Sequence, residues 1–342
     1  MANSSADEIY LGLKRIKNPV QFIDSRIDVD AFCSALAMYH ILKEHFGITL
    51  TLCYEKSIPQ RYYELVKDLI EVPQIKQNCI PKFYDFSKHD SMICTDTGNL
   101  AHVSGISEFV RPENILIFDI DHHAANKGYG DFNYVKELGS ACTVIYELLK
   151  KWRVQPDKQI ATSLLAGIIT DTGFYKYNST TEQDFEYSSE LIEYGASHFK
   201  ISWNLNFNQT IDDINLKKLI FNNLTIDLKN KIAYTTITLK ELEDNHIDMD
   251  NSAIAPSDEI KSIKGIDYAF TVKEIISDEY SHNISVRSRI EDFNCIALVK
   301  LLNPISGGHK MAAGANIKAK SIDDAISLVI DTAKKVKSQE NS

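Results

Sequence analysis

Apolar and polar residues alternate along the first part of the chain in a way that predicts an α/β domain. From Pro19 to about Gly195, short apolar runs alternate with amphipathic segments, which is typical of βαβ units around a mostly parallel sheet. The predicted strands are 20–24, 48–54, 91–96 and 114–121, and the predicted helices are 31–47, 141–152 and 156–171. The expected fold is α/β, with helices flanking this sheet.

The pattern changes after Gly195. A polar, Asn-rich stretch over 197–222 is predicted to form a linker helix. Beyond it, alternating polarity predicts strands, and the chain ends in a predicted helix; the segments are 226–239, 267–275 and 282–290, and then 321–336. We therefore expect a first domain over 1–196, the linker helix, and a second, smaller α/β domain over 223–342.

Length and composition place the chain among ordinary globular proteins. Its 342 residues are enough for two domains, each with its own core. No apolar run approaches the roughly 18 residues of a membrane span, and the opening segment MANSSADEIYLGLKRIKNP is polar, so we expect a cytoplasmic protein with no membrane partner. The six cysteines form no CxxC pair, which argues against a zinc knuckle or a disulfide framework and predicts buried thiols.

The charge balance narrows the class of partner. Lys and Arg number 37 against 47 Asp and Glu, for a formal net charge of −10. This is the wrong sign for a protein that holds long duplex DNA through counterion release. Small phosphorylated substrates remain compatible with it, because bound divalent cations reverse the local potential of an acidic cleft. The oligomeric state stays open, a homodimer included.

Carboxylates follow several of the apolar runs in the first domain. They are Asp24, Asp28 and Asp30, then Asp96, then Asp121 with His122 and His123, and finally Asp171. Open α/β sheets bind ligands at the carboxyl ends of their strands, and unpaired buried carboxylates are costly. Such a cluster needs cations, and carboxylates with one imidazole suit Mn²⁺ or Mg²⁺ better than zinc. Two ions with a bridging carboxylate are expected to lower the pKa of a bridging water.

Each of these motifs also has a purely structural interpretation. The DVD sequence at 28–30 can cap a helix or face solvent, and Asp171 can end a helix without a further role. A histidine in the pair His122 and His123 can be a satisfied core residue. The functional alternative is that adjacent histidines point to different sides of an extended chain, so that one binds metal and the other faces substrate.

The second domain carries a candidate anion site. In SGGHKMAAGA, at 306–315, Gly307 and Gly308 allow backbone amides to approach an anion, and His309 with Lys310 adds charge. The alternative is a tight turn before a small-residue packing face. Arg287 either faces solvent from a strand or offers its planar fork to a phosphate or carboxylate.

Taken together, these motifs resemble the DHH/DHHA1 phosphoesterase family across nearly the whole chain. The segments that carry the resemblance, in the family's order, are FIDSRIDVDAFCSA, ICTDTG, IDHHAAN, LLAGIITDTGFYKYNSTT and SGGHKMAAGA. The two-domain layout looks most like the nanoRNase/pAp-phosphatase branch, and stand-alone cyclic-dinucleotide phosphodiesterases share it. The resemblance implies that residues 1–196 bind metal and that residues 223–342 bind substrate.

The resemblance also implies roles for individual residues. One metal site would contain Asp28 and Asp96, and the other Asp30, Asp96, His122 and Asp171, with Asp96 bridging the ions. His123 would face the scissile phosphate and Asp121 would orient the histidine pair. The residues implied to hold the rest of the substrate are Arg287, Gly307, Gly308 and His309. The implied cofactor is two Mn²⁺ ions, with Mg²⁺ or another divalent ion as the alternative.

The chain departs from the family's pattern at a few positions. The first motif of the family usually opens with a histidine where this chain has Asp24. Asp24 is therefore expected either to ligate the first metal, to bind it more weakly, or to form an ion pair with Arg26. Cys33 stands where a glycine is usual, and Ile305 and Ser306 replace the first two glycines of a four-glycine run.

The expected function is a two-metal-dependent phosphoesterase that hydrolyses short oligonucleotides, nucleotide phosphates such as phosphoadenosine phosphate (pAp), or both. A cyclic-dinucleotide phosphodiesterase and an exopolyphosphatase stay open, because only the pocket of the second domain would distinguish these substrates. A degenerate binding or scaffold protein is a further alternative. Asp24 supports that alternative, whereas the retention of the other acidic and histidine motif residues opposes it.

Overall fold

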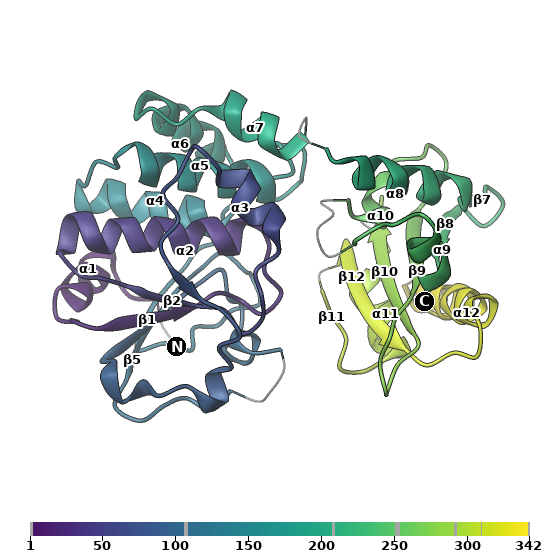
Figure 1. Ribbon diagram of the computed structural model, residues 1–342, viewed down its shortest axis with the longest axis horizontal. Coiled ribbons are helices and arrows are strands. Elements are labelled where there is room, and N and C mark those ends of the chain that lie inside the picture. Colours follow the sequence, from purple (N-terminus) through teal and green to yellow (C-terminus); the bar gives the residue numbers. More distant parts are fainter. Residues whose placement is uncertain are drawn as a thin grey trace. The chain divides into compact units, whose positions relative to one another are not determined.

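The chain folds into two separate units. The computed structural model describes residues 3–105, 109–206, 209–249, 254–290, 293–308 and 310–340. The units are Met1–Phe207 and Asn208–Ser342 (Figure 1). The stretch 197–222 contains two helices, of which α7 (His198–Asn206) belongs to the first unit and α8 (Ile211–Asn222) to the second.

A parallel six-stranded sheet forms the centre of the first unit. Its strands are β1 (Pro19–Phe22), β2 (Thr51–Cys53), β3 (Ile75–Lys76), β4 (Ser91–Thr95), β5 (Leu116–Asp121) and β6 (Phe132–Val135), in the order β3-β2-β1-β4-β5-β6. Every pairing in it is parallel, which agrees with the mostly parallel sheet predicted from the sequence. The central strands β1 and β4 are buried throughout, because both faces of a parallel sheet are covered.

Helices pack on one face of this sheet and turns on the other (Figure 1). The helices are α1 (Ala6–Leu13), α2 (Val29–Ile41, extended by a π-helical turn Leu42–Phe46), α3 (Gln60–Val66), α4 (Ala141–Trp152), α5 (Lys158–Asp171) and α6 (Glu182–Glu193). Their core includes Phe32, Leu36, Ile145 and Leu165. On the opposite face, Val20, Phe22 and Met92 pack against Tyr84 and Phe86, which lie beside the short 3₁₀ turns Pro81–Phe83 and Phe86–Lys88. A further 3₁₀ turn, η4, covers Leu100–Val103.

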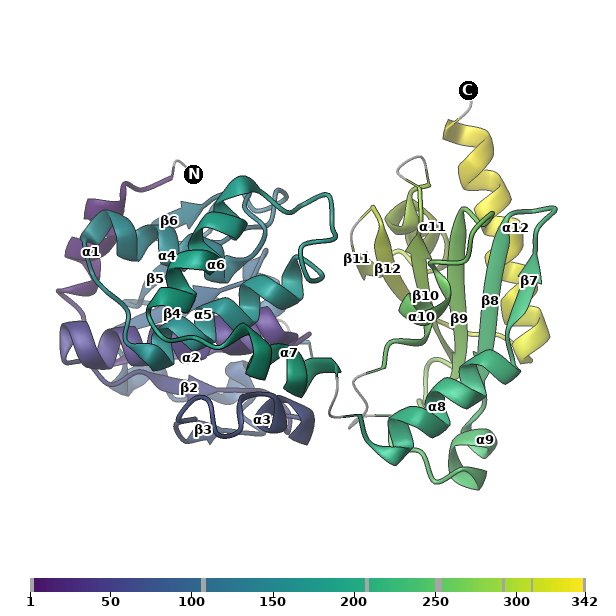
Figure 2. The ribbon, with the colours of Figure 1, turned by 90° about the horizontal axis from the view of Figure 1, so that it is seen from above.

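The second unit is a mixed six-stranded sheet between two layers of helix (Figure 2). Its strands are β7 (Thr225–Asp227), β8 (Ile232–Ile237), β9 (Tyr268–Glu274), β10 (His282–Ser288), β11 (Gly307–Gly308) and β12 (Ala312–Ile317), in the order β11-β12-β10-β9-β8-β7. Core residues of α11 (Cys295–Leu302) and α12 (Ile322–Glu340) pack on one face. The other core includes residues of α8 and α10 (Pro256–Ile260), and a short helix α9 spans Leu239–Asp244.

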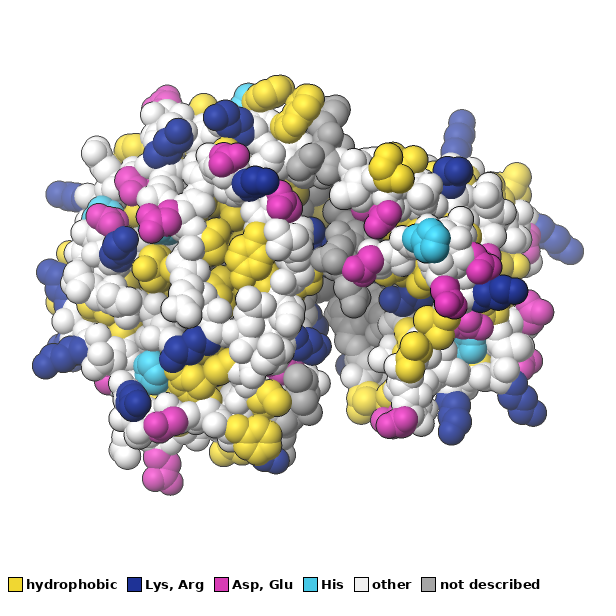
Figure 3. Space-filling model, viewed as in Figure 1, with side chains coloured by type: hydrophobic (Ala, Val, Ile, Leu, Met, Phe, Trp, Pro, Cys, Tyr) yellow, Lys and Arg dark blue, Asp and Glu magenta, His cyan; other side chains and the backbone are white. Residues whose placement is uncertain are grey.

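The distribution of surface charge and the burial of the cysteines are typical of a globular protein. Lys and Arg side chains are interspersed with Asp and Glu over the face seen in Figure 3. All six cysteines are free thiols; five are buried and Cys79 is partly exposed. None of the helices in the described ranges has both the length and the apolar character that a membrane span requires.

Candidate metal centre

Strand register brings three of the predicted carboxylates to one level of the sheet. Gln21 of β1 pairs with Ile93 of β4, and Thr95 of β4 pairs with Ile120 of β5. Continuing each pairing to the strand ends places Asp24, Asp96 and Asp121 side by side at the carboxyl edge. Asp96 has a left-handed backbone, with φ of 54°, and its amide donates to the Ile120 carbonyl at 3.2 Å. A left-handed aspartate is uncommon and occurs where a turn requires it.

Two further carboxylates are positioned by the start of α2. Asp28 is its N-cap, and Oδ1 of Asp28 accepts from the Ala31 amide at 2.9 Å. Asp30 is buried in the first turn, where its oxygens accept from the amides of Ala141 at 2.6 Å and Cys142 at 3.2 Å. Those amides begin α4, so Asp30 occupies the positive end of a helix dipole.

His122 is oriented with its Nε2 atom facing acidic side chains. Its Nδ1 atom lies 3.1 Å from the Leu138 carbonyl oxygen, and since a carbonyl only accepts, Nδ1 carries the proton. Nε2 lies 3.2 Å from Oδ1 of Asp96 and 3.4 Å from Oδ2 of Asp171, the last residue of α5. A backbone carbonyl that holds one ring nitrogen and leaves the other for a ligand is the usual arrangement of metal-binding histidines.

His123 is held differently, by a buried carboxylate. Its Nδ1 atom lies 2.7 Å from Oδ1 of Asp121, and Oδ2 of Asp121 accepts from Asn126 Nδ2 at 2.7 Å. The same Asn126 amide donates to both oxygens of Asp119. Asp121 is therefore engaged on both oxygens, and the two histidines have different partners, as expected for adjacent residues on an extended chain.

Burial and like charges perturb the titration of the cluster. Burial, together with the charges of Asp28 and Asp30, raises the pKa of Asp96 well above its usual range. Burial also raises the pKa of Asp171 to about 8, against the opposing effect of His122. Burial disfavours the charged form of His122, but the hydrogen bond and charge of Asp96 outweigh it and raise its pKa. Without a cation, Asp30, Asp96 and Asp171 are driven to retain protons, because burial raises the pKa of each of them.

The donor set fits divalent cations. Ligand atoms of Asp96, Asp121, His122 and His123 lie within 4.8 Å of one another, and so do those of Asp30, His122 and Asp171. Asp24 and Asp28 are outside these two groups. Oδ2 of Asp24 is nevertheless buried at the same sheet edge, and it has no hydrogen-bond partner among the residues that the structure describes. Carboxylate oxygens with one imidazole nitrogen suit hard divalent ions.

Three polar residues around this centre are not singled out by the sequence patterns above: Glu55, Asp119 and Asn126. Glu55 lies level with Asp24 in the register of β1 and β2, and its buried carboxylate accepts from Ser104 Oγ at 2.7 Å and from the Gly105 amide at 2.9 Å. Its signal in the sequence is the position directly after TLCY, at the end of a predicted strand. Asp119 sits inside its strand and Asn126 in a loop, so neither has a comparable local signal.

The predicted substrate residues lie in the second unit. Nε of Arg287, on β10, lies 3.2 Å and 3.1 Å from the two oxygens of Asp258, and its Nη1 atom donates to Ser285 and to the Val286 carbonyl. Gly307 and Gly308 form β11, and Gly308 has φ of 140°. His309 lies outside the described residues.

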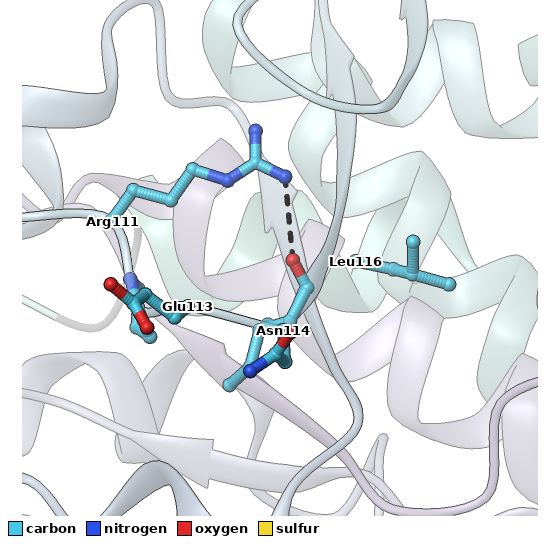
Figure 4. Close-up of a pocket in the computed structure, with 6 residues that line it drawn as sticks. Arg111, Glu113, Asn114 and Leu116 are labelled. Carbon is cyan, nitrogen blue, oxygen red and sulfur yellow. Dashed lines mark hydrogen bonds between the residues drawn. The ribbon is translucent and has the colours of Figure 1, made fainter.

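A separate hollow lies at the opposite edge of the first sheet (Figure 4). It has a volume of about 640 Å³ and is lined by residues 111–116, which lead into β5. Arg111 donates to the Ile115 carbonyl at 3.4 Å and pairs with Asp131 at 2.5 Å. Because Asp121 ends the strand that begins beside this hollow, the hollow is not part of the acidic cluster.

Comparison with known proteins identifies two domain types. The N-terminal domain of the DHH family matches residues 20–168, and the DHHA1 domain matches residues 229–335. A probable bifunctional oligoribonuclease and PAP phosphatase of Streptococcus mutans is 31% identical over 207 residues, which are 59% of this chain and 63% of that protein. The corresponding enzyme of Thermus thermophilus is 24% identical over 94% of this chain and 91% of its own length.

A solved structure agrees with these matches at the level of the fold. An exopolyphosphatase-related protein from Bacteroides fragilis superposes with a TM-score of 0.85, at 20% identity, over 98% of this chain and 97% of its own. The two domains occur in the order that the motifs predict. With both of its domains matched in that order, the chain belongs to the DHH family and carries a C-terminal DHHA1 domain.

Proposed function

We propose that this protein is a divalent-cation-dependent phosphoesterase that hydrolyses short oligonucleotides, nucleotide phosphates such as pAp, or both. The observation that carries the proposal is the convergence of Nε2 of His122 with the carboxylates of Asp30, Asp96 and Asp171. Asp30 and Asp96 are buried and Asp171 is partly buried, and acids held this close together are costly without cations. The proteins of S. mutans and T. thermophilus described above, which are named for this pair of activities, support the substrate class.

We assign the cluster to two ions, with Mn²⁺ as the expected species and Mg²⁺ as the alternative. Asp30, Asp96, His122 and Asp171 would hold one ion, and Asp28 with Asp96 the other, with Asp24 as an additional ligand through its unpartnered Oδ2. Bound divalent cations would supply positive charge and a water of lowered pKa next to the scissile phosphate.

The protein's own side chains would then orient the reacting groups. Asp121 holds Nδ1 of His123 at 2.7 Å, which fixes the ring, and we assign its Nε2 atom to a phosphoryl oxygen of the substrate. Asn126 holds the second oxygen of Asp121, so that this carboxylate does not rotate away. Hydrogen-bond donors that are fixed before the reaction stabilise the negative charge that develops in the transition state.

Recognition of the rest of the substrate would be carried by the second unit. Arg287 offers a guanidinium already oriented by Asp258, and the backbone of Gly307 and Gly308 is accessible to an anion because neither residue carries a side chain. His309 is assigned to the same group from its place in the motif. The net charge of −10 favours small substrates over long duplexes.

The test is product release by the full-length protein with Mn²⁺, Mg²⁺ or a chelator. The substrates are a short RNA oligomer, pAp, a cyclic dinucleotide and polyphosphate. We expect cation-dependent release of mononucleotides from the oligomer or of phosphate from pAp, and loss of that activity in His122→Ala with an unchanged circular dichroism spectrum. Turnover of only the cyclic dinucleotide or polyphosphate would correct the substrate class, and no turnover with any cation would favour a scaffold protein.

A further inference from the structure

An arginine and a histidine outside the assigned ligand and catalytic residues lie together at the rim of the acidic cluster. Nη2 of Arg26 is 2.8 Å from Nδ1 of His102. Arg26 follows β1 by four residues, and His102 belongs to the 3₁₀ turn η4 that follows β4. These two strands are neighbours in the sheet, so both residues extend from the carboxyl edge at which the cluster forms.

The contact between them defines the hydrogen-bonding state of the imidazole. A guanidinium is always protonated and only donates, so Nη2 of Arg26 donates and Nδ1 of His102 accepts. The proton of the neutral ring is then on Nε2. Burial and the positive charge of Arg26 also lower the pKa of His102, which agrees with a neutral ring. His102 therefore presents an N–H donor and not a metal ligand at Nε2.

The Arg26 guanidinium has N–H donors that its contacts with Asp24 and His102 do not use. Nε of Arg26 donates to Oδ1 of Asp24 at 3.3 Å, and Nη2 donates to His102. Within the described ranges, no acceptor bonds to Nη1 of Arg26 or to Nε2 of His102. The Arg26 side chain is also 51% exposed, so a ligand has access to it.

The surrounding backbone holds this pair in place. The Ser25 amide donates to the His102 carbonyl at 3.0 Å, which ties the segment after β1 to η4. Ser104 and Gly105, which follow His102 by two and three residues, donate hydrogen bonds to the buried carboxylate of Glu55. These bonds anchor the end of η4. Donors that are fixed before binding lose little conformational entropy when a ligand arrives.

We propose that Arg26 and His102 form a phosphate-binding pair that holds a second phosphate of the substrate, one that is not cleaved. Two N–H donors, one of them permanently charged, match the oxygens of a phosphate monoester or diester. The inference rests on the proposed function, because it assumes that the cations and His123 take the scissile phosphate. Because of this pair, the protein would prefer substrates with more than one phosphate group.

The test compares substrates that differ by one phosphate. Steady-state kinetics with Mn²⁺ are measured on pAp and on adenosine 3′-phosphate, which lacks the second phosphate, and on a dinucleotide with and without a 5′-phosphate. The variants are Arg26→Gln and His102→Ala. The matched controls are Arg15→Gln and His45→Gln, at exposed positions of the same unit. Binding of Mn²⁺ to each variant is measured by calorimetry.

We expect Arg26→Gln and His102→Ala to raise KM about tenfold for the substrate with the additional phosphate, the loss typical of one charge-assisted hydrogen bond. The kinetics on the partner substrate should stay within about twofold of the wild type, because that substrate lacks the additional phosphate. The affinity of His102→Ala for Mn²⁺ should also stay within about twofold, because the hydrogen-bond partner of His102 is Arg26 and not an assigned ligand. The two control variants should behave as wild type in every measurement.

Two results would overturn the inference while the proposed function stands. Equal losses on both members of a substrate pair, accompanied by weaker Mn²⁺ binding, would mean that Arg26 serves only as the counterion of Asp24. Unchanged kinetics in both variants would mean that the pair does not touch substrate. If the wild-type protein turns over none of the four substrates, the proposed function itself fails and the inference fails with it.

Discussion

Gly167 on α5 lies against Asp30 on α2 so closely that a side chain would not fit between the helices. A Cβ atom at Gly167 would stand 2.4 Å from Oδ1 of Asp30 and 2.3 Å from Sγ of Cys142. Real Cβ atoms do not approach other atoms this closely, so any side chain at this position must move one of its neighbours. The position of Asp30 therefore depends on a residue that lies more than a hundred positions away in the sequence.

Replacing Gly167 by alanine is expected to reduce both stability and cation affinity. Overpacking a well-filled core typically costs about 1–3 kcal/mol, and here the displaced group includes a proposed ligand. Urea denaturation measures the first effect and calorimetric titration with Mn²⁺ the second. In Cys142→Ala/Gly167→Ala the contact with Sγ is removed but that with Asp30 remains, so stability should recover in part and cation affinity should not. Wild-type Mn²⁺ affinity in Gly167→Ala would remove Asp30 from the ligand set.

Gly98 has a similar relationship with His123. A Cβ atom at Gly98 would stand 3.2 Å from Cγ of the His123 ring, so the ring must shift by a few tenths of an ångström in Gly98→Ala. We expect kcat to fall about tenfold, because small displacements of reacting groups have large kinetic effects, with little change in KM or stability. Single-turnover kinetics and thermal melting would measure these effects. An unchanged kcat would contradict the assignment of His123 to the scissile phosphate.

Asp258 is expected to act through Arg287. Both of its oxygens lie near Nε of Arg287, and Oδ1 also accepts from Lys261 at 2.7 Å. Asp258→Asn keeps the shape but weakens the ion pair, so KM for nucleotide substrates should rise severalfold while kcat is unchanged. Lys261→Gln, which leaves the Arg287 contact in place, is the control. If Arg287→Ala itself leaves KM unchanged, Arg287 has no part in substrate binding.

The cation-free protein is expected to lose stability as the pH rises from about 4 to about 8. The pKa of Asp171 is raised to about 8 in the folded protein, so over this range the unfolded chain releases a proton that the folded chain retains. The raised pKa of His122 acts in the same direction, because its stabilising charge is lost as the pH increases. The lowered pKa of Asp121, about 2, has its effect only at lower pH.

Melting temperatures in a chelator, measured at intervals between pH 4 and pH 9, would test this dependence. Asp171→Asn should make the curve flatter, whereas Asp7→Asn, at an exposed position, should not. Saturating Mn²⁺ should raise stability most at neutral pH and above, because cations then replace the retained protons. A ligand at 100 times its Kd adds about 2.7 kcal/mol to the free energy of unfolding. An equal pH slope in Asp171→Asn and in the wild type would contradict the coupling of Asp171 to the cluster.

Much of the fold follows from local patterns in the sequence. The helix predicted over 141–152 is α4 with the same bounds, because its apolar spacing is regular and Ser140 caps it. The predicted strands over 91–96 and 114–121 also form, since continuous apolar runs fit a sheet covered on both faces. The sequence patterns do not single out the two-residue strand β3 or the strand β6, and these strands form by parallel pairing with β2 and β5.

The candidate site also follows in part from the sequence and in part from the tertiary structure. The sequence by itself determined which residue types end the strands, because short-range order sets where an apolar run stops and a carboxylate follows. Only the tertiary structure decided that Asp24, Asp96 and Asp121 share one level, since strand register depends on pairing between distant segments. The tertiary structure likewise decided three contacts that no local pattern predicts, because close packing brings these residues together only when the chain is folded. They are the hydrogen bond of His122 to the Leu138 carbonyl, the bonds of Asn126 to Asp119 and Asp121, and the contact of Arg26 with His102.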